Sequence, residues 1–194
     1  MLPSSPVFRC GPAGLLALLA GLLVFSLESG ASGPRLNKSM FEIAIRPLVV
    51  AYEMPPYLVL GEGEGGPVAS LVSAAFKAAG KDVGLDIRPS RQLAKLLLGQ
   101  LDEGGILGLP SDFSVAERER LLAEVVYVFK TPEGDTPLTV YLPESDKNAA
   151  LRQAFRQGLD KLVENGDYLS ILTRFHGDDR AAREDLDRLL AYRK

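Results

Sequence analysis

Three glycines near the N-terminal third of the chain are spaced as a dinucleotide-binding loop requires. The motif Gly61-x-Gly63-x-x-Gly66 follows an expected strand, and Asp86 comes about 20 residues later, where a ribose-binding carboxylate would lie. However, Glu62 and Glu64 would place two carboxylates beside the pyrophosphate and oppose the helix N-terminus that should bind it. Pro55-Pro56 also separates the strand from the loop. We therefore interpret the motif as an acidic surface turn.

Other residues with catalytic or metal-binding potential are few and scattered. One Cys and one His exclude a multi-cysteine zinc site, an iron–sulfur cluster and a disulfide framework. His176 has no second ligand or base near it in sequence, so we expect a structural role. Asp102-Glu103 and Asp178-Asp179 are pairs of adjacent acids, but adjacency in sequence alone does not place two carboxylates on one side of a substrate. The sequence predicts no enzyme, no cofactor and no metal, and a net charge of −3 argues against nucleic acid.

The N-terminal residues 1–33 have the pattern of an export signal. Arg9 precedes an apolar run from Gly11 to Leu27, and small residues follow at 29–33, where a signal peptidase could cleave. Cys10 would leave with this leader. The apolar run is short of the roughly 20 residues of a full membrane span, although an uncleaved anchor is the alternative. We therefore expect a periplasmic protein.

The mature chain alternates expected strands and helices. The strands are expected at 48–52, 83–88, 105–109, 125–130 and 138–142, and the helices at 68–79, 91–98, 115–122, 146–163 and 167–176. This alternation is typical of βαβ units, so we predict an α/β fold with one flavodoxin-like, mostly parallel sheet flanked by helices. The lobe spans residues 34–177, and 178–194 form a charged helical tail that docks weakly.

Polar and aromatic residues follow the first three expected strands, at the sheet edge where open α/β folds bind ligands. Met54 and Tyr57 follow the first strand, Ser90 and Arg91 the second, and Ser111 the third. Three of them have an ordinary structural alternative: Tyr57 can pack under its own loop, Ser90 can cap a helix, and Ser111 can cap a turn. We predict these five as candidate ligand-binding residues.

The order of the elements resembles that of family 3 periplasmic solute-binding proteins, the amino-acid type with a type II fold. A strand ending in Pro55-Pro56-Tyr57 is followed by helix, strand, helix and Leu101-Asp102 before a short apolar strand. Val115-Ala116-Glu117-Arg118 is similar to the family's Thr-Pro-Glu-Arg element, and Val126-Tyr127-Val128-Phe129 falls where its hinge strand lies. The closing helices correspond to the segment that ends at Gly166–Leu172.

This resemblance implies non-covalent binding of a small polar solute, an amino acid or small carboxylate, for a membrane transporter such as an ABC transporter or for a sensor. It implies that Arg118 binds the solute's carboxylate through a charge-assisted fork. It also places a stacking aromatic near Met54. The alternative for Arg118 is a solvated helix arginine among neighbouring charges.

The sequence departs from the family pattern in two ways that affect the expected ligand binding. The family inserts a second lobe of roughly 90 residues between its hinge strands, whereas Lys130 and Leu138 are separated here by a turn. The family's paired acids at the first helix are absent from Ala69–Ser73. We therefore predict one lobe without hinge closure, with a protein-interaction module as the alternative function.

Overall fold

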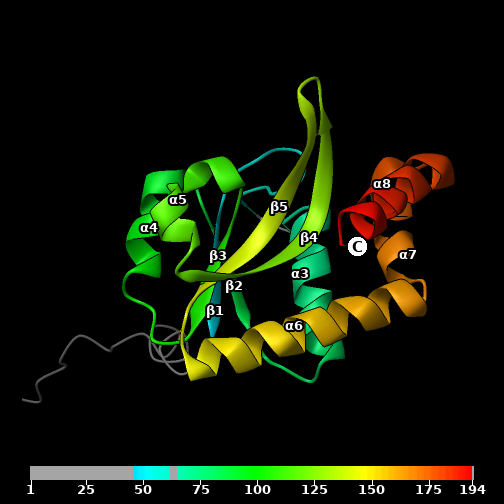
Figure 1. Cartoon of the computed structure of the whole chain (residues 1–194). Coiled ribbons are helices and arrows are strands. Elements are labelled where there is room, and N and C mark those ends of the chain that lie inside the picture. Colours follow the sequence, from blue (N-terminus) through cyan, green and yellow to red (C-terminus); the bar gives the residue numbers. More distant parts are fainter. Residues whose placement is uncertain (1–45, 62–64, 194) are drawn as a thin grey trace, which may run out of the picture. The chain divides into compact units, whose positions relative to one another are not determined.

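The computed structural model describes residues 46–61 and 65–193, so the predicted leader at 1–33 lies outside the described residues. The strands are β1 (Leu48–Tyr52), β2 (Gly84–Arg88), β3 (Gly104–Gly108), β4 (Leu121–Thr131) and β5 (Gly134–Pro143). The helices are α3 (Pro67–Ala78), α4 (Arg91–Leu98), α5 (Val115–Arg118), α6 (Asp146–Glu164), α7 (Asp167–His176) and α8 (Asp179–Tyr192), with a 3₁₀ turn η1 at Pro110–Asp112 (Figure 1).

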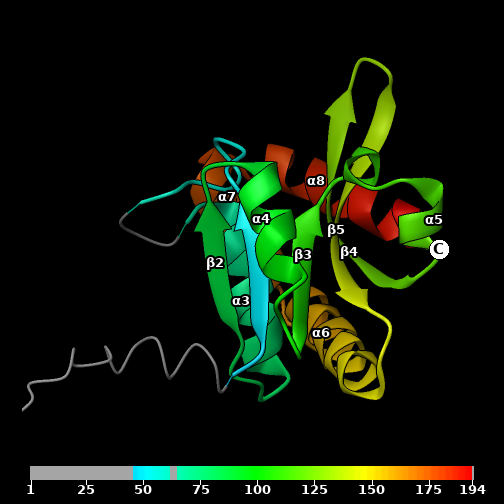
Figure 2. The same ribbon diagram turned by 90° about the vertical axis from the view of Figure 1, so that its left-hand side faces the viewer.

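All five strands form one sheet in the order β2-β1-β3-β5-β4 (Figure 2). The β1 strand runs parallel to both β2 and β3, while β5 runs antiparallel to β3 and β4. This arrangement confirms the predicted α/β class. It also places the carboxyl ends of β1, β2 and β3 at one edge, which is where the candidate residues were expected.

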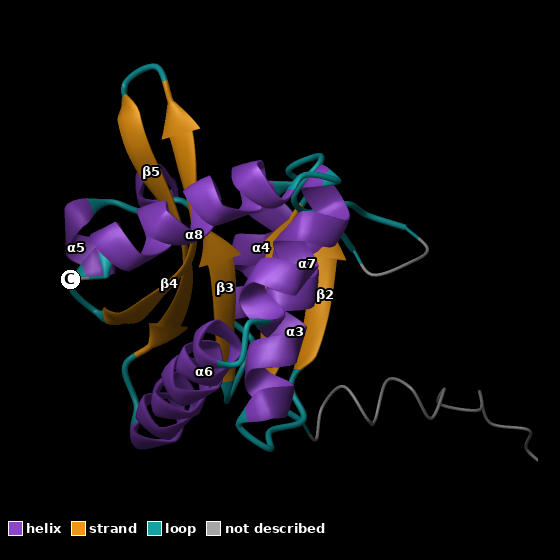
Figure 3. Cartoon of the chain, turned by 90° about the vertical axis from the view of Figure 1, so that its right-hand side faces the viewer, coloured by secondary structure: helices purple, strands orange, loops and turns teal. Residues whose placement is uncertain are grey.

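Helices cover both faces of the sheet. Val49 and Ala51 of β1 are buried in the core that includes α3 and α6, while Leu48 and Val50 are buried on the α4 side. Figure 3 shows α3, α6, α7 and α8 on the same side of the sheet. A β-carbon on Gly158 of α6 would lie 1.8 Å from a backbone oxygen of α3, so glycine permits these two helices to touch.

The two long strands β4 and β5 form a hairpin where a second lobe would be inserted. Their pairing runs from Leu121 opposite Pro143 to Thr131 opposite Gly134. Within residues 65–193, the connection is therefore a tight turn. The same pairing corrects the helix expected at 115–122: α5 ends at Arg118, because the following residues leave the helix to pair with β5.

The C-terminal helix α8 is anchored more firmly than its charged sequence suggests. Ala182 and Leu189 are buried, but so is Asp185, whose carboxylate accepts a hydrogen bond from the Tyr127 hydroxyl of β4. His176 Nε2 lies 2.8 Å from the same carboxylate. The tail at 178–194 thus docks through a polar anchor in addition to its leucines. No helix of the described residues is long and apolar enough to cross a membrane.

Candidate functional site

A buried carboxylate occupies the sheet edge at which a ligand was expected. Asp112 follows β3 and is only 7% exposed. Its Oδ2 accepts hydrogen bonds from the Tyr52 hydroxyl at 2.6 Å and from the Leu109 backbone N–H at 2.7 Å. Its Oδ1 accepts from Arg91 Nη1 at 3.1 Å. The ends of β1 and β3 and the start of α4 therefore supply three donors to one carboxylate.

Local sequence explains why Asp112 turns back into the sheet. Pro110 begins the 3₁₀ turn η1, and the Asp112 backbone N–H donates to the Leu109 carbonyl at 3.0 Å. The preceding Gly108 permits the close approach, because a β-carbon there would lie 2.8 Å from Asp112 Oδ2. Arg91 reaches the carboxylate from the first turn of α4, which Ser90 caps. The backbone of residues 108–112 thus folds around the Asp112 carboxylate.

The electrostatics of this site keep Tyr52 neutral. Burial raises the pKa of Tyr52 well above its usual range, and the hydrogen bond and the charge of Asp112 raise it further. A neutral phenol is a donor, so the Tyr52 hydroxyl can donate its hydrogen bond to Asp112 Oδ2. Together with Arg91 and the Leu109 N–H, it forms a set of donors that suits a carboxylate group.

The pKa values of two tyrosines beneath α7 and α8 are raised in the same way. Burial raises the pKa of Tyr127, helped by its hydrogen bond to Asp185, and burial raises the pKa of Tyr168, whose hydroxyl donates to the Val126 carbonyl at 3.0 Å. With folded pKa values above the unfolded value of about 10, their contribution to stability is complete below pH 10 and is lost as the pH rises above it.

We therefore expect the free energy of unfolding to fall above about pH 10, by about 1.4 kcal/mol per pH unit for each of these tyrosines. Urea midpoints measured across this range, together with tyrosinate absorbance, check the expectation. Ionisation of Tyr52, Tyr127 and Tyr168 near pH 10, with native circular dichroism intact, would contradict it.

The structure places three of the six predicted site residues around η1. Arg91 contacts Asp112, as described above. Ser111 lies exposed within η1. Arg118 is exposed on α5, and its Nη1 donates to the Pro110 carbonyl at 3.2 Å. A patch of two arginines and a hydroxyl therefore surrounds the segment that carries the buried carboxylate.

The other three predicted residues have structural contacts. Ser90 Oγ accepts from the Leu93 N–H at 3.4 Å, as expected of a helix cap. Met54 closes a short turn, since its N–H donates to the Leu58 carbonyl at 2.9 Å. The Tyr57 ring packs against aromatic rings of β4 and α7, with centroids 4.7 Å from Phe129, 5.4 Å from Tyr127 and 5.9 Å from Phe175. The Tyr57 ring thus belongs to an aromatic cluster with β4 and α7.

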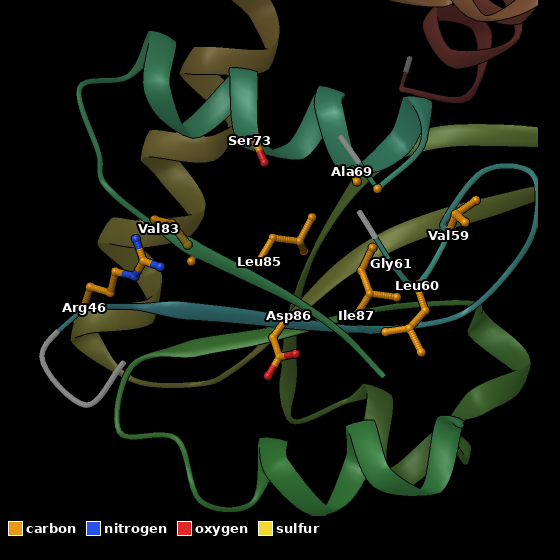
Figure 4. A pocket seen from close by; sticks show the side chains of 12 residues that line it. Arg46, Val59, Leu60, Gly61, Ala69, Ser73, Val83, Leu85, Asp86 and Ile87 are labelled. Carbon is orange, nitrogen blue, oxygen red and sulfur yellow. The ribbon is translucent and has the colours of Figure 1, made fainter. Parts of the chain in front are cut away.

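Sequence reasoning missed Tyr52 and Asp112 as site residues. Asp112 lies next to Ser111, in a polar insertion after the third expected strand. That position was the available signal in the sequence. A hollow of about 450 Å³ lies instead along β2, and none of the six predicted residues lines it (Figure 4). Among the described residues, no group of three or more Asp, Glu, His or Cys is placed to hold a metal ion.

Comparison with known proteins supports the fold. No family model matches the sequence, and no curated protein matches it. Among solved structures, the chain is similar to the ligand-binding core of GluR0 from Nostoc punctiforme in complex with L-glutamate. The sequence identity is 10%, the TM-score is 0.52, and the match covers 66% of this chain and 98% of that chain.

At this identity the likeness shows the fold alone. The five-stranded mixed sheet and its flanking helices define a single α/β lobe similar to a lobe of a periplasmic binding protein. The predicted resemblance to that class is confirmed at the level of fold.

Proposed function

We propose that this chain is an exported, single-lobe binding protein that holds a small carboxylate-bearing solute, such as an amino acid, without chemistry or cofactor. The observation that carries the proposal is the Asp112 site: a hydroxyl, a backbone N–H and an arginine converge on a carboxylate at the edge where open α/β sheets bind ligands. The similar GluR0 core, which holds L-glutamate, supports the same use of the fold.

The solute's carboxylate would meet two arginines in different states. Arg91 is engaged by Asp112, so a solute must compete with an internal carboxylate for it. Arg118 uses one N–H on the Pro110 carbonyl and is otherwise exposed, so its guanidinium can offer a fork to an incoming carboxylate. Competition from Asp112 for Arg91, and the open face of a single lobe, both weaken binding of the solute. We expect affinities no better than about micromolar.

The biological task belongs to the same proposal. The export pattern at 1–33 supports a periplasmic location, where a small-solute binder would present its solute to a membrane transporter or a sensor protein. No catalytic set of nucleophile, base and orienting group emerges from the site described above. Binding is therefore the activity that its geometry supports best.

A second candidate, a protein-interaction module, is favoured by one specific observation. Leu93 and Leu96 on α4 are 46% and 63% exposed, and Val115 at the start of α5 is 64% exposed. The two helices are joined by an ion pair between Lys95 and Glu117, with Nζ and Oε1 3.6 Å apart. Exposed apolar side chains beside arginines are typical of a surface that docks a protein.

We expect Arg118→Ala to weaken solute binding about ten-fold, because an exposed arginine–carboxylate contact contributes roughly 1–2 kcal/mol. Arg118→Lys should not restore the affinity fully, since the fork geometry is lost. Calorimetric titration of the exported chain with acetate and a panel of amino acids measures both variants. The melting temperature without solute should barely change.

Arg120→Ala is the matched control, because Arg120 is also exposed and lies two residues further along. Its affinity should equal that of the wild type. Equal affinity in Arg118→Ala would remove Arg118 from the site. Failure of the wild type to bind any carboxylate at millimolar concentration would overturn solute binding in favour of the interaction module.

A further inference from the structure

The β2 strand lies at the edge of the sheet and turns half of its backbone groups outward. The Gly84 N–H donates to the Pro47 carbonyl and the Arg88 carbonyl accepts from the Glu53 N–H, both at 2.9 Å, so the even-numbered residues face β1. Backbone groups alternate in direction along a strand, so those of Leu85 and Ile87 point away from the sheet. No described residue hydrogen-bonds to them on that side.

We propose that a second copy of this chain adds its β2 strand antiparallel to this edge, with Leu85 on the two-fold axis. Leu85 then lies opposite Leu85 of the partner subunit, and Val83 lies opposite Ile87 of the partner subunit. Leu85 and Ile87 have outward N–H and C=O groups, and Val83 would extend the strand by one residue beyond Gly84, so each opposed pair can exchange two hydrogen bonds. Their side chains share one face and form apolar cross-strand pairs.

The charges of β2 select this register. With Leu85 on the axis, Asp82 lies opposite Arg88 of the partner subunit, and Gly84 lies opposite Asp86 of the partner subunit. Asp82 is 86% exposed although Arg46 Nη1 lies 3.5 Å from its Oδ1, and Arg88 is 42% exposed beside its own Asp86. Both side chains are therefore accessible to the partner strand. Opposite charges on facing strands stabilise pairing and like charges oppose it.

Neighbouring registers give less favourable charge pairing or fewer hydrogen bonds. An axis at Asp86 would place two aspartates opposite each other. An axis at Ile87 would place Leu85 opposite Pro89 of the partner subunit, and proline has no N–H to donate. The register centred on Leu85 is therefore the one that combines full hydrogen bonding with complementary charge.

The space beside β2 suits the added strand. Figure 4 shows β2 between α3 and α4, with Leu85 and Ile87 on the α3 side and Asp86 on the opposite side. The hollow of about 450 Å³ lies on that α3 side and is flanked by Val59 and Leu60, which are 39% and 46% exposed. The partner's apolar side chains would cover this surface. The inference goes beyond solute binding and stands whether or not a solute binds.

Cysteine cross-linking tests the register directly. Every variant carries Cys10→Ala, since Cys10 is the only cysteine of the sequence. Leu85→Cys places two thiols on the axis, with Cα atoms about 5.5 Å apart, within disulfide reach. Ile87→Cys is the matched control, because its two Cα atoms would lie about 14 Å apart. We expect Leu85→Cys to cross-link at least about ten-fold faster under mild oxidation.

Sedimentation equilibrium tests the association without cross-linking. The wild type should have the mass of a dimer, and Arg88→Glu should weaken association about ten-fold by opposing Asp82 with an acid. Adding Asp82→Arg to Arg88→Glu should restore it, and circular dichroism shows that the variants are folded. A monomeric wild type, or cross-linking of Ile87→Cys at least as fast as that of Leu85→Cys, would overturn the proposal.

Discussion

Asp185→Ala will lower the free energy of unfolding by about 3–5 kcal/mol, although Asp185 lies on a helix in which half of the residues are charged. Asp185 is 3% exposed and accepts from the Tyr127 hydroxyl and an Arg188 N–H, with His176 Nε2 also 2.8 Å away. Its removal leaves the hydroxyl of a buried tyrosine and a partly buried arginine without their acceptor. Urea unfolding of wild type and variant, followed by circular dichroism, measures the loss.

Asp187→Ala is the control on the same helix, because Asp187 is exposed, and it should change stability by less than about 0.5 kcal/mol. Combining Tyr127→Phe with Asp185→Ala should cost less than the sum of the two single changes, since both partners of one hydrogen bond are then removed together. A loss below about 1 kcal/mol for Asp185→Ala would mean that α8 docks through its apolar residues alone.

Asp112→Ala will destabilise the fold by about 3 kcal/mol and leave an unfilled carboxylate site. Tyr52, Arg91 and the Leu109 N–H all lose their acceptor. A small carboxylate that enters this site binds only the folded state, so it should raise the melting temperature. Thermal unfolding in sodium formate and in sodium chloride, at equal ionic strength, separates this effect from screening.

The wild type is the control for the formate experiment, because Asp112 already fills the site. Its melting temperature should rise less in formate, relative to chloride, than that of Asp112→Ala, because in the wild type formate can bind only at the exposed Arg118. An equal response of the two proteins to formate would contradict the assignment of these three donors as a carboxylate site.

Local signals explain how much of the fold was predictable. Ser90 before an amphipathic run gives the start of α4 at Arg91, and Pro67 after the glycine-rich turn gives the start of α3. The end of α5 was not predictable in this way. Leu121 pairs with Pro143 of β5, and a long-range pairing of this kind leaves no local mark on the sequence.

The candidate site was predictable only in part, for the same reason. Ligands bind at the carboxyl ends of the strands in open α/β sheets, so the sequence predicted that Arg91 and Ser111 would lie at one edge, where the structure places them. The Asp112–Tyr52 contact joins residues 60 positions apart, so neither residue stood out in sequence. Tyr57 was a candidate ligand residue, but its ring packs against Phe129 of β4. The chain reaches β4 only after six further elements, α3, β2, α4, β3, η1 and α5.

The most direct test of the carboxylate site is a nuclear magnetic resonance titration of the chain with acetate and then with free amino acids. The account predicts saturable shifts of backbone amides centred on Arg91, Leu109 and Arg118, because those residues surround the segment that holds Asp112. Absence of shifts at millimolar solute, or saturable shifts confined to residues away from 88–91 and 109–118, would contradict it.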